Sequence, residues 1–166
     1  MMTFELKAPA VMSPQSRLWV YQCNRLLSEH EVVELRRDMA AFIAQWTSHG
    51  AQMDATAEVL HNCVVVVILD EHKAGASGCG IDKSVQFIQQ WSAPREVDMM
   101  SRQTVIYREA DAIKLTTVPH FWAMRKAGII DDDTQLIDPT IQKWGDWPAQ
   151  GWVSFKNSWH QMMWGR

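Results

Sequence analysis

The sequence has few cysteines, no excess of basic residues and no long apolar run, and each absence excludes a class of protein. Its three cysteines, Cys23, Cys63 and Cys79, form no CxxC pair, so we expect reduced thiols, with the first two in the core. The formal net charge of −3 leaves no basic footprint for nucleic acid or an anionic membrane. The longest apolar run, from Cys63 to Leu69, is far shorter than the roughly 18 residues of a membrane span. The first residues also lack the basic stretch and long apolar core of a signal peptide. These absences predict a cytoplasmic protein with no nucleic-acid or membrane partner.

What remains is an ordinary globular composition, with 47% hydrophobic and 21% charged residues. At about 150 residues per domain, 166 residues predict a single domain over 1–166. Residues 1–16 are expected to form an irregular leader. Five of the nine tryptophans fall in 144–166, which predicts a tryptophan-rich tail packed on the domain by large aromatic side chains. The alternative is that these tryptophans line a binding surface.

The segment after Leu27 carries the clearest helix signals in the chain. Ser28 and Glu31 stand at the two positions of a capping box, in which each side chain bonds a backbone N–H of the first turn. Gly50 suits the left-handed residue that ends a helix. We therefore predict a helix over 29–48, whose apolar face is formed by Val32, Leu35, Met39, Phe42 and Trp46.

Further patterns predict the remaining elements. The run from Cys63 to Leu69 is apolar without alternation, as expected of a central strand that is covered on both faces. Pro119 and Gly128 have the usual asymmetry of helix ends. The order β-α-β-α-β-β-α-β predicts an α/β or α+β fold, a single-domain sandwich of a mixed sheet with helices. The predicted strands are 17–21, 58–69, 104–108, 112–117 and 134–137, and the further helices are 80–92 and 119–128.

A polar, glycine-rich loop from Asp70 to Asp82 follows the predicted central strand and precedes the next helix. Backbone N–H groups near Gly78 and Gly80 would then lie at the positive end of the helix dipole, which attracts anions. Ser77 is placed to cap that helix. The loop therefore predicts a binding site for a small anionic ligand.

Cys79 in this loop is a candidate nucleophile, because the dipole at a first helical turn lowers the pKa of a thiol. Glu71 and Asp82 are the candidate carboxylates that would orient a base or bind a cation. Arg25 and Lys83 are candidate partners of the anion. The alternative is that Cys79 is a small residue in a tight turn, since free cysteines are mostly buried and inert.

Two parts of this region match a nucleotide-binding site in composition but not in spacing. Val65 to Glu71 has the apolar run and carboxylates of a Walker B strand, and the glycines from Gly75 to Gly80 have P-loop spacing. A P-loop needs its Lys-Ser/Thr pair directly after the second glycine. Here Ile81-Asp82 precedes Lys83-Ser84, which turns both groups about 200° around the helix, at ~100° per residue. The sequence therefore predicts no P-loop ATPase.

Several short motifs are spread along the chain: Tyr21-Gln22-x-x-Arg25, Trp46-x-x-His49-Gly50, Asn62, Asp70-Glu71, the Ala76–Asp82 loop and Ser158-Trp159-His160. Together they resemble the pattern of a small family of uncharacterised bacterial proteins that is often labelled "ABC transporter ATPase". The resemblance implies a shared fold and loop but no established reaction, and it implies His49, Trp159 and His160 as further ligand-site residues. The label lacks support here, because the chain has no Walker A motif and no LSGGQ-type signature. Gly80 also departs from the serine of the family's loop.

The histidines lack metal-ligand spacing, and the chain contains no HExxH motif, so we predict no metal site and assign no cofactor. The acidic run at 131–133 is expected to be a solvated turn. The sequence thus favours binding of a small anionic ligand at the loop, with thiol chemistry at Cys79 as a further expectation. The alternative is a non-enzymatic interaction module that uses the tryptophan-rich C-terminal segment.

Overall fold

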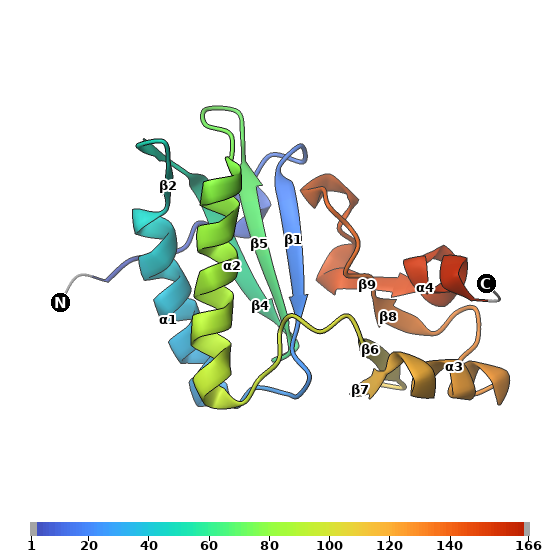
Figure 1. Cartoon of the computed structure of the whole chain (residues 1–166). Coiled ribbons are helices and arrows are strands. Elements are labelled where there is room, and N and C mark those ends of the chain that lie inside the picture. Colours follow the sequence, from blue (N-terminus) through green and yellow to red (C-terminus); the bar gives the residue numbers. More distant parts are fainter. Residues whose placement is uncertain (1–2, 165–166) are drawn as a thin grey trace.

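A computed structural model describes residues 3–164, and its strands fall into two main sheets with a small hairpin (Figure 1). The first part of the chain contains β1 (Arg17–Gln22), α1 (Glu29–Gln45), β2 (Thr47–Ser48), β3 (Ala51–Gln52), β4 (Asp54–Leu60), β5 (Val64–Asp70) and α2 (Gly78–Ser92). The second part contains β6 (Thr104–Glu109), β7 (Ala112–Thr117), α3 (Val118–Lys126), β8 (Gln135–Ile137), β9 (Trp152–Ser154) and α4 (Trp159–Met163). Short 3-10 turns lie at Pro9–Val11, Ala93–Arg95, Trp144–Asp146, Ala149–Gly151 and Phe155–Asn157.

The first sheet has the strand order β1-β5-β4, with β5 at its centre. Every residue from Val64 to Leu69 is at most 2% exposed, as predicted for a strand that is covered on both faces. Helices α1 and α2 lie side by side over one face (Figure 1). The N-terminal segment packs on β4, where the Thr56 hydroxyl donates to the Lys7 carbonyl (2.6 Å).

Helix α1 begins as predicted, with both bonds of the Ser28–Glu31 capping box formed. The predicted end at residue 48 is wrong, because the helix stops at Gln45 and Thr47–Ser48 pairs with Ala51–Gln52. The left-handed conformation of Gly50 (φ 79°) serves the turn of this β2–β3 hairpin and not a helix end. His49 precedes it with φ 51°, and two successive positive φ angles are typical of a two-residue hairpin.

The predicted strand 58–69 is in fact two antiparallel strands, β4 and β5. The chain reverses between them at His61 and Asn62, whose φ angles are 55° and 57°. Asparagine and histidine adopt this conformation more readily than most residues, so the turn needs no glycine or proline. For this reason the composition of the segment gives no turn signal.

The second sheet has the order β7-β6-β8-β9, and α3 packs against it through the fully buried Phe121. The hairpin of β6 and β7 and the helix that Gly128 follows are as predicted. The fold is a mixed α and β single domain, which confirms the predicted class. All strand pairings in the described residues are antiparallel, however, so neither sheet is mixed. None of the described helices is long and apolar enough to span a membrane.

The two sheets share side chains and backbone contacts along the free edge of β1. Ile106 of β6 and Ile137 of β8 belong to the same buried cluster as the first sheet. The Leu18 N–H donates to the Gln142 carbonyl (2.9 Å), and the Gln22 side-chain amide donates to the Thr104 carbonyl (3.0 Å). The second sheet therefore lies beside the β1 edge, as Figure 1 shows.

Candidate functional site

The polar groups of the Asp70–Asp82 loop are largely used to hold the loop itself. Helix α2 begins at Gly78, two residues earlier than predicted, and the Ser77 hydroxyl caps it by accepting from the Gly80 N–H (3.2 Å). The same hydroxyl lies 2.6 Å from that of Ser48, and the Gly80 carbonyl accepts from the Trp46 indole N–H (2.9 Å). Ser77 and Gly80 are thus engaged within the protein.

Gly80 also lies where a larger residue would crowd the β2–β3 hairpin. A Cβ at this position would stand 3.2 Å from the Ser48 Cβ, which is closer than ordinary packing. This contact is a physical reason for glycine here, where the resembling family has serine.

Cys79 is exposed on the first turn of α2. In the described part of the chain it has no hydrogen bond to either candidate carboxylate. Glu71 instead accepts from the Ala76 N–H (3.1 Å) and pairs with Arg17 (3.4 Å), so it closes the loop. Asp82 is exposed three residues after the thiol on the same helix, and no hydrogen bond joins the two side chains in the described residues. Within the residues that the structure describes, no side chain is hydrogen-bonded to Cys79 as a general base would be.

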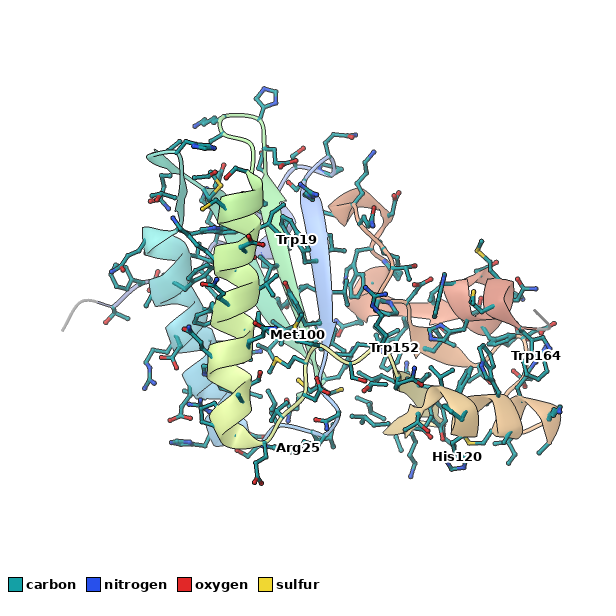
Figure 2. The ribbon with its side chains drawn as sticks, in the orientation of Figure 1. Trp19, Arg25, Met100, His120, Trp152 and Trp164 are labelled. Atoms are coloured by element: carbon teal, nitrogen blue, oxygen red, sulfur yellow. The ribbon has the colours of Figure 1, made fainter. Side chains whose placement is uncertain are left out.

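Of the predicted anion partners, one lies near this loop and one does not. Lys83 donates to the Thr47 carbonyl (3.3 Å) at the start of the adjacent hairpin, whose exposed turn carries His49. Arg25 is wrong as a partner of the loop. Its guanidinium donates two hydrogen bonds to the Glu31 carboxylate (2.8 and 3.0 Å), a bidentate ion pair, and a third to the Arg95 carbonyl (2.8 Å). Figure 2 shows it at the end of α2 that is farthest from the loop.

Cys23 and Cys63 are both fully buried, as predicted. Burial raises the pKa of each thiol to about 12, because the charged form would lose its hydration. Their role is in packing.

The remaining predicted residues, Trp159 and His160, line a separate cleft of about 370 Å³ beside the second half of β1. Its walls come from four parts of the chain, and Figure 2 labels Met100 on the segment that crosses from α2 to β6. The lining is residues 20–22, 99–102, 104, 139–140 and 159–160. A cleft of this size, with mostly apolar walls and a few polar groups, is typical of small-molecule sites.

Two buried polar atoms of the cleft residues lack a hydrogen-bond partner. They are the Gln22 Oε1 and the His160 Nδ1, in side chains of residues only 5% and 2% exposed. Among the residues described, only one other buried side-chain atom, the Ser16 Oγ, has no partner. Leaving such a group unsatisfied costs roughly 1–3 kcal/mol, so two in one cleft require an explanation.

The His160 ring is held between aromatic side chains. Its centroid lies 5.3 Å from that of Trp159 and 5.7 Å from that of Phe121. Burial lowers the pKa of His160 below its ordinary value, while the nearby Asp138 opposes this shift. The ring is therefore neutral at pH 7.

Asp138 sets the geometry of this wall. Its carboxylate accepts from the Trp159 N–H (2.7 Å), and from the N–H and hydroxyl of Thr140 (2.9 and 2.6 Å). Ser158 caps the short helix α4 by accepting from the Gln161 N–H (3.4 Å). The Ser-Trp-His motif thus positions two cleft residues, far from the glycine-rich loop.

Sequence reasoning did not identify Asp138, Arg102 or the two methionines at 99–100 as site residues. Tyr21 and Gln22 stood in a motif without an assigned role. An Asp-Pro step at 138–139 is a turn signal, but nothing in the sequence places that turn beside β1.

The tryptophans of the tail are half-buried and packed. Trp144, Trp147 and Trp152 pack on the main core, and Trp164 lies 5.4 Å from the Trp122 ring. This arrangement agrees with a tail that is fixed to the domain.

In the range 3–164, no group of histidine, cysteine, aspartate or glutamate side chains could hold a metal ion. Comparisons with known protein families, curated proteins and solved structures find no match to this chain. The resemblance to the bacterial family stays a prediction of the sequence.

Proposed function

We propose that the protein binds a small organic molecule in the cleft beside β1. The observation that carries this proposal is the pair of buried, unpartnered atoms, Gln22 Oε1 and His160 Nδ1, in residues that line one cleft. A bound molecule with hydrogen-bonding groups would satisfy atoms that are otherwise costly to bury.

Apolar contacts support the same site. Met99 is 3% exposed and Trp159 is half-buried, so their side chains offer an apolar wall beside the polar groups. A few convergent polar groups in an apolar cleft fix the orientation of a ligand. The glycine-rich loop lacks this combination, since its hydroxyl and one of its N–H groups are bonded within the protein.

A nuclear magnetic resonance screen tests the proposal, with small carboxylic acids, amides and neutral aromatic compounds as probes. We expect a saturable shift of the Trp159 indole signal and of the backbone signals of Val20 and Thr140. Met100→Trp, at the 42% exposed cleft residue, should weaken binding. Met162→Trp places the same ring at a 60% exposed position outside the cleft lining and serves as the control.

Shifts confined to residues 78–81 would move the binding site back to the glycine-rich loop. The proposal of binding in the cleft would also be contradicted if Met100→Trp and Met162→Trp bind the same compound equally strongly.

A further inference from the structure

The cleft runs along an open stretch of β1. Tyr21 and Gln22 both line it, although successive side chains of a strand point to opposite faces of the sheet. A cleft that touches both residues must therefore include the edge of the strand.

The direction of the backbone groups at this edge follows from the hydrogen bonds at its two ends. The Cys23 N–H bonds to the Cys63 carbonyl on the β5 side, whereas the Leu18 N–H bonds to Gln142 on the outer side. Because backbone groups alternate along an antiparallel strand, the N–H and C=O of Val20 and Gln22 point outward, toward the cleft. No partner for these groups occurs within the described residues.

This open edge is short. Pairing with residues 142–143 closes it at Leu18, and the bond from Gln22 to Thr104 closes it at the other end. The edge can pair with about one amide unit, because pairing bonds recur every second residue. It has no room for a full strand.

The Gln22 side chain adds an acceptor of fixed orientation. Its Nε2 donates to the Thr104 carbonyl (3.0 Å), and a flipped amide would place two oxygens against each other. The Oε1 therefore faces away from Thr104, and no N–H or O–H of the described residues donates to it.

Arg102 is the only lysine, arginine, aspartate or glutamate among the lining residues. It is exposed, and it forms no ion pair or side-chain hydrogen bond with the part of the chain that the structure describes. A guanidinium at the rim of an apolar cleft suits a carboxylate.

We infer that the ligand is a small carboxylic acid with one secondary amide and an apolar group, of the N-acylated amino acid class. Its carboxylate lies at Arg102 and its amide at the Val20–Gln22 edge, with the apolar group against Met99 and Trp159. This inference rests on the proposed function, since it names the chemistry of the molecule that occupies the same cleft.

Isothermal titration with three matched probes tests the inference. N-acetyl-L-phenylalanine should bind, and its amide analogue, N-acetyl-L-phenylalaninamide, should bind about fivefold more weakly because the charge is lost. N-acetyl-N-methyl-L-phenylalanine should bind about tenfold or more weakly, because it lacks the N–H donor. Arg102→Gln should weaken binding of the acid about fivefold and leave the amide analogue unaffected. Arg37→Gln, the same change of charge at an exposed residue of α1, is the control.

Equal affinity of the acid and amide probes, or an Arg102→Gln variant with unchanged affinity for the acid, would overturn the inference. A pentapeptide ending in phenylalanine that binds tenfold more tightly than the small acid would also overturn it, in favour of strand addition. If none of the probes binds while other compounds bind in the cleft, the ligand class is wrong and the proposed function stands. If no compound binds in the cleft, both fail.

Discussion

At the scale of single residues, His160 combines deep burial with a titratable ring. Its Nδ1 has no partner, and its ring is enclosed by Phe121 and Trp159. A neutral ring can lie there at moderate cost, but a charged ring would lose its hydration. This single side chain therefore links the stability of the fold to pH.

We predict that the free energy of unfolding falls as the pH is lowered below about 6.5, partly because of His160. The folded pKa lies below the ordinary value of 6.5, so the unfolded chain takes up this proton first. Above that value both states are neutral and the effect vanishes. Urea unfolding at pH 7.5, 6.0 and 5.0 measures it.

The matched variants are His160→Phe, which keeps an aromatic ring without titration, and His72→Gln, which removes an exposed histidine. His160→Phe should flatten the pH dependence and His72→Gln should not. An identical slope in His160→Phe and the wild type would exclude His160 as the source.

The thiols differ in accessibility and not only in position. Iodoacetamide at pH 8 should label Cys79 alone in the folded protein, because Cys23 and Cys63 are fully buried with pKa values raised to about 12. Mass spectrometry counts the labels, and a Cys79→Ser variant should take up none until urea unfolds it. Labelling of Cys23 before unfolding would show that the core opens locally.

At the scale of elements, the C-terminal segment is held mainly by buried side chains other than its tryptophans. Phe155 is fully buried, and its ring centroid lies 6.0 Å from that of Phe121. Trp159, by contrast, is half-buried in the cleft wall. Among the side chains of this segment, Phe155 and His160 are therefore the fully enclosed anchors, although the sequence analysis expected the tryptophans to hold the tail.

We predict that Phe155→Ala lowers the free energy of unfolding by about 3–5 kcal/mol, the usual cost of emptying an aromatic core position. Trp159→Ala should cost clearly less and should weaken ligand binding in the cleft. Urea unfolding of the two variants gives the comparison. A larger loss of stability in Trp159→Ala than in Phe155→Ala would contradict this assignment.

At the scale of the whole molecule, the main core joins the two sheets, although the second sheet also has a buried cluster of its own around Phe121. Ile106 and Ile137 come from the second sheet, yet they pack in the cluster of β5 and the two long helices. His61 lies in the turn between β4 and β5, where its Nε2–H donates to the Gln150 carbonyl (2.7 Å). Its ring centroid lies 4.7 Å from that of Trp152. If either sheet unfolds, side chains that are buried against the other sheet become exposed to water.

We predict one cooperative unfolding transition. Tryptophan fluorescence and far-ultraviolet circular dichroism should give the same midpoint, because side chains of both sheets are buried in the main core. Ile137→Ala should lower the free energy of unfolding by roughly 2–5 kcal/mol, the usual cost of such a truncation. It should therefore shift the midpoints of both signals equally. Two separate midpoints would show that the sheets unfold independently.

Much of the local structure could be predicted from the sequence, because it depends on residues close in the chain. The capping box at Ser28 and Glu31 and the helix end near Gly128 are local signals. The covered strand β5 follows from an unbroken apolar run. The predicted end of α1 was wrong because Gly50 suits a hairpin turn as well as a helix end. Only the pairing of β2 with β3 decides between the two.

The candidate site could be decided only by the tertiary structure. Gln22, Arg102, Thr140 and His160 are far apart in the sequence, and their meeting depends on how the second sheet lies along β1. Whether a polar atom lacks a hydrogen-bond partner also depends on tertiary packing. In the unfolded chain water can bond to every polar side chain, and only burial removes that water. The sequence by itself determined the three longest helices, several of the strands and the buried cysteines through short-range patterns. The tertiary structure alone decided where those elements leave a strand edge and two polar atoms unpaired, because that depends on contacts between distant segments.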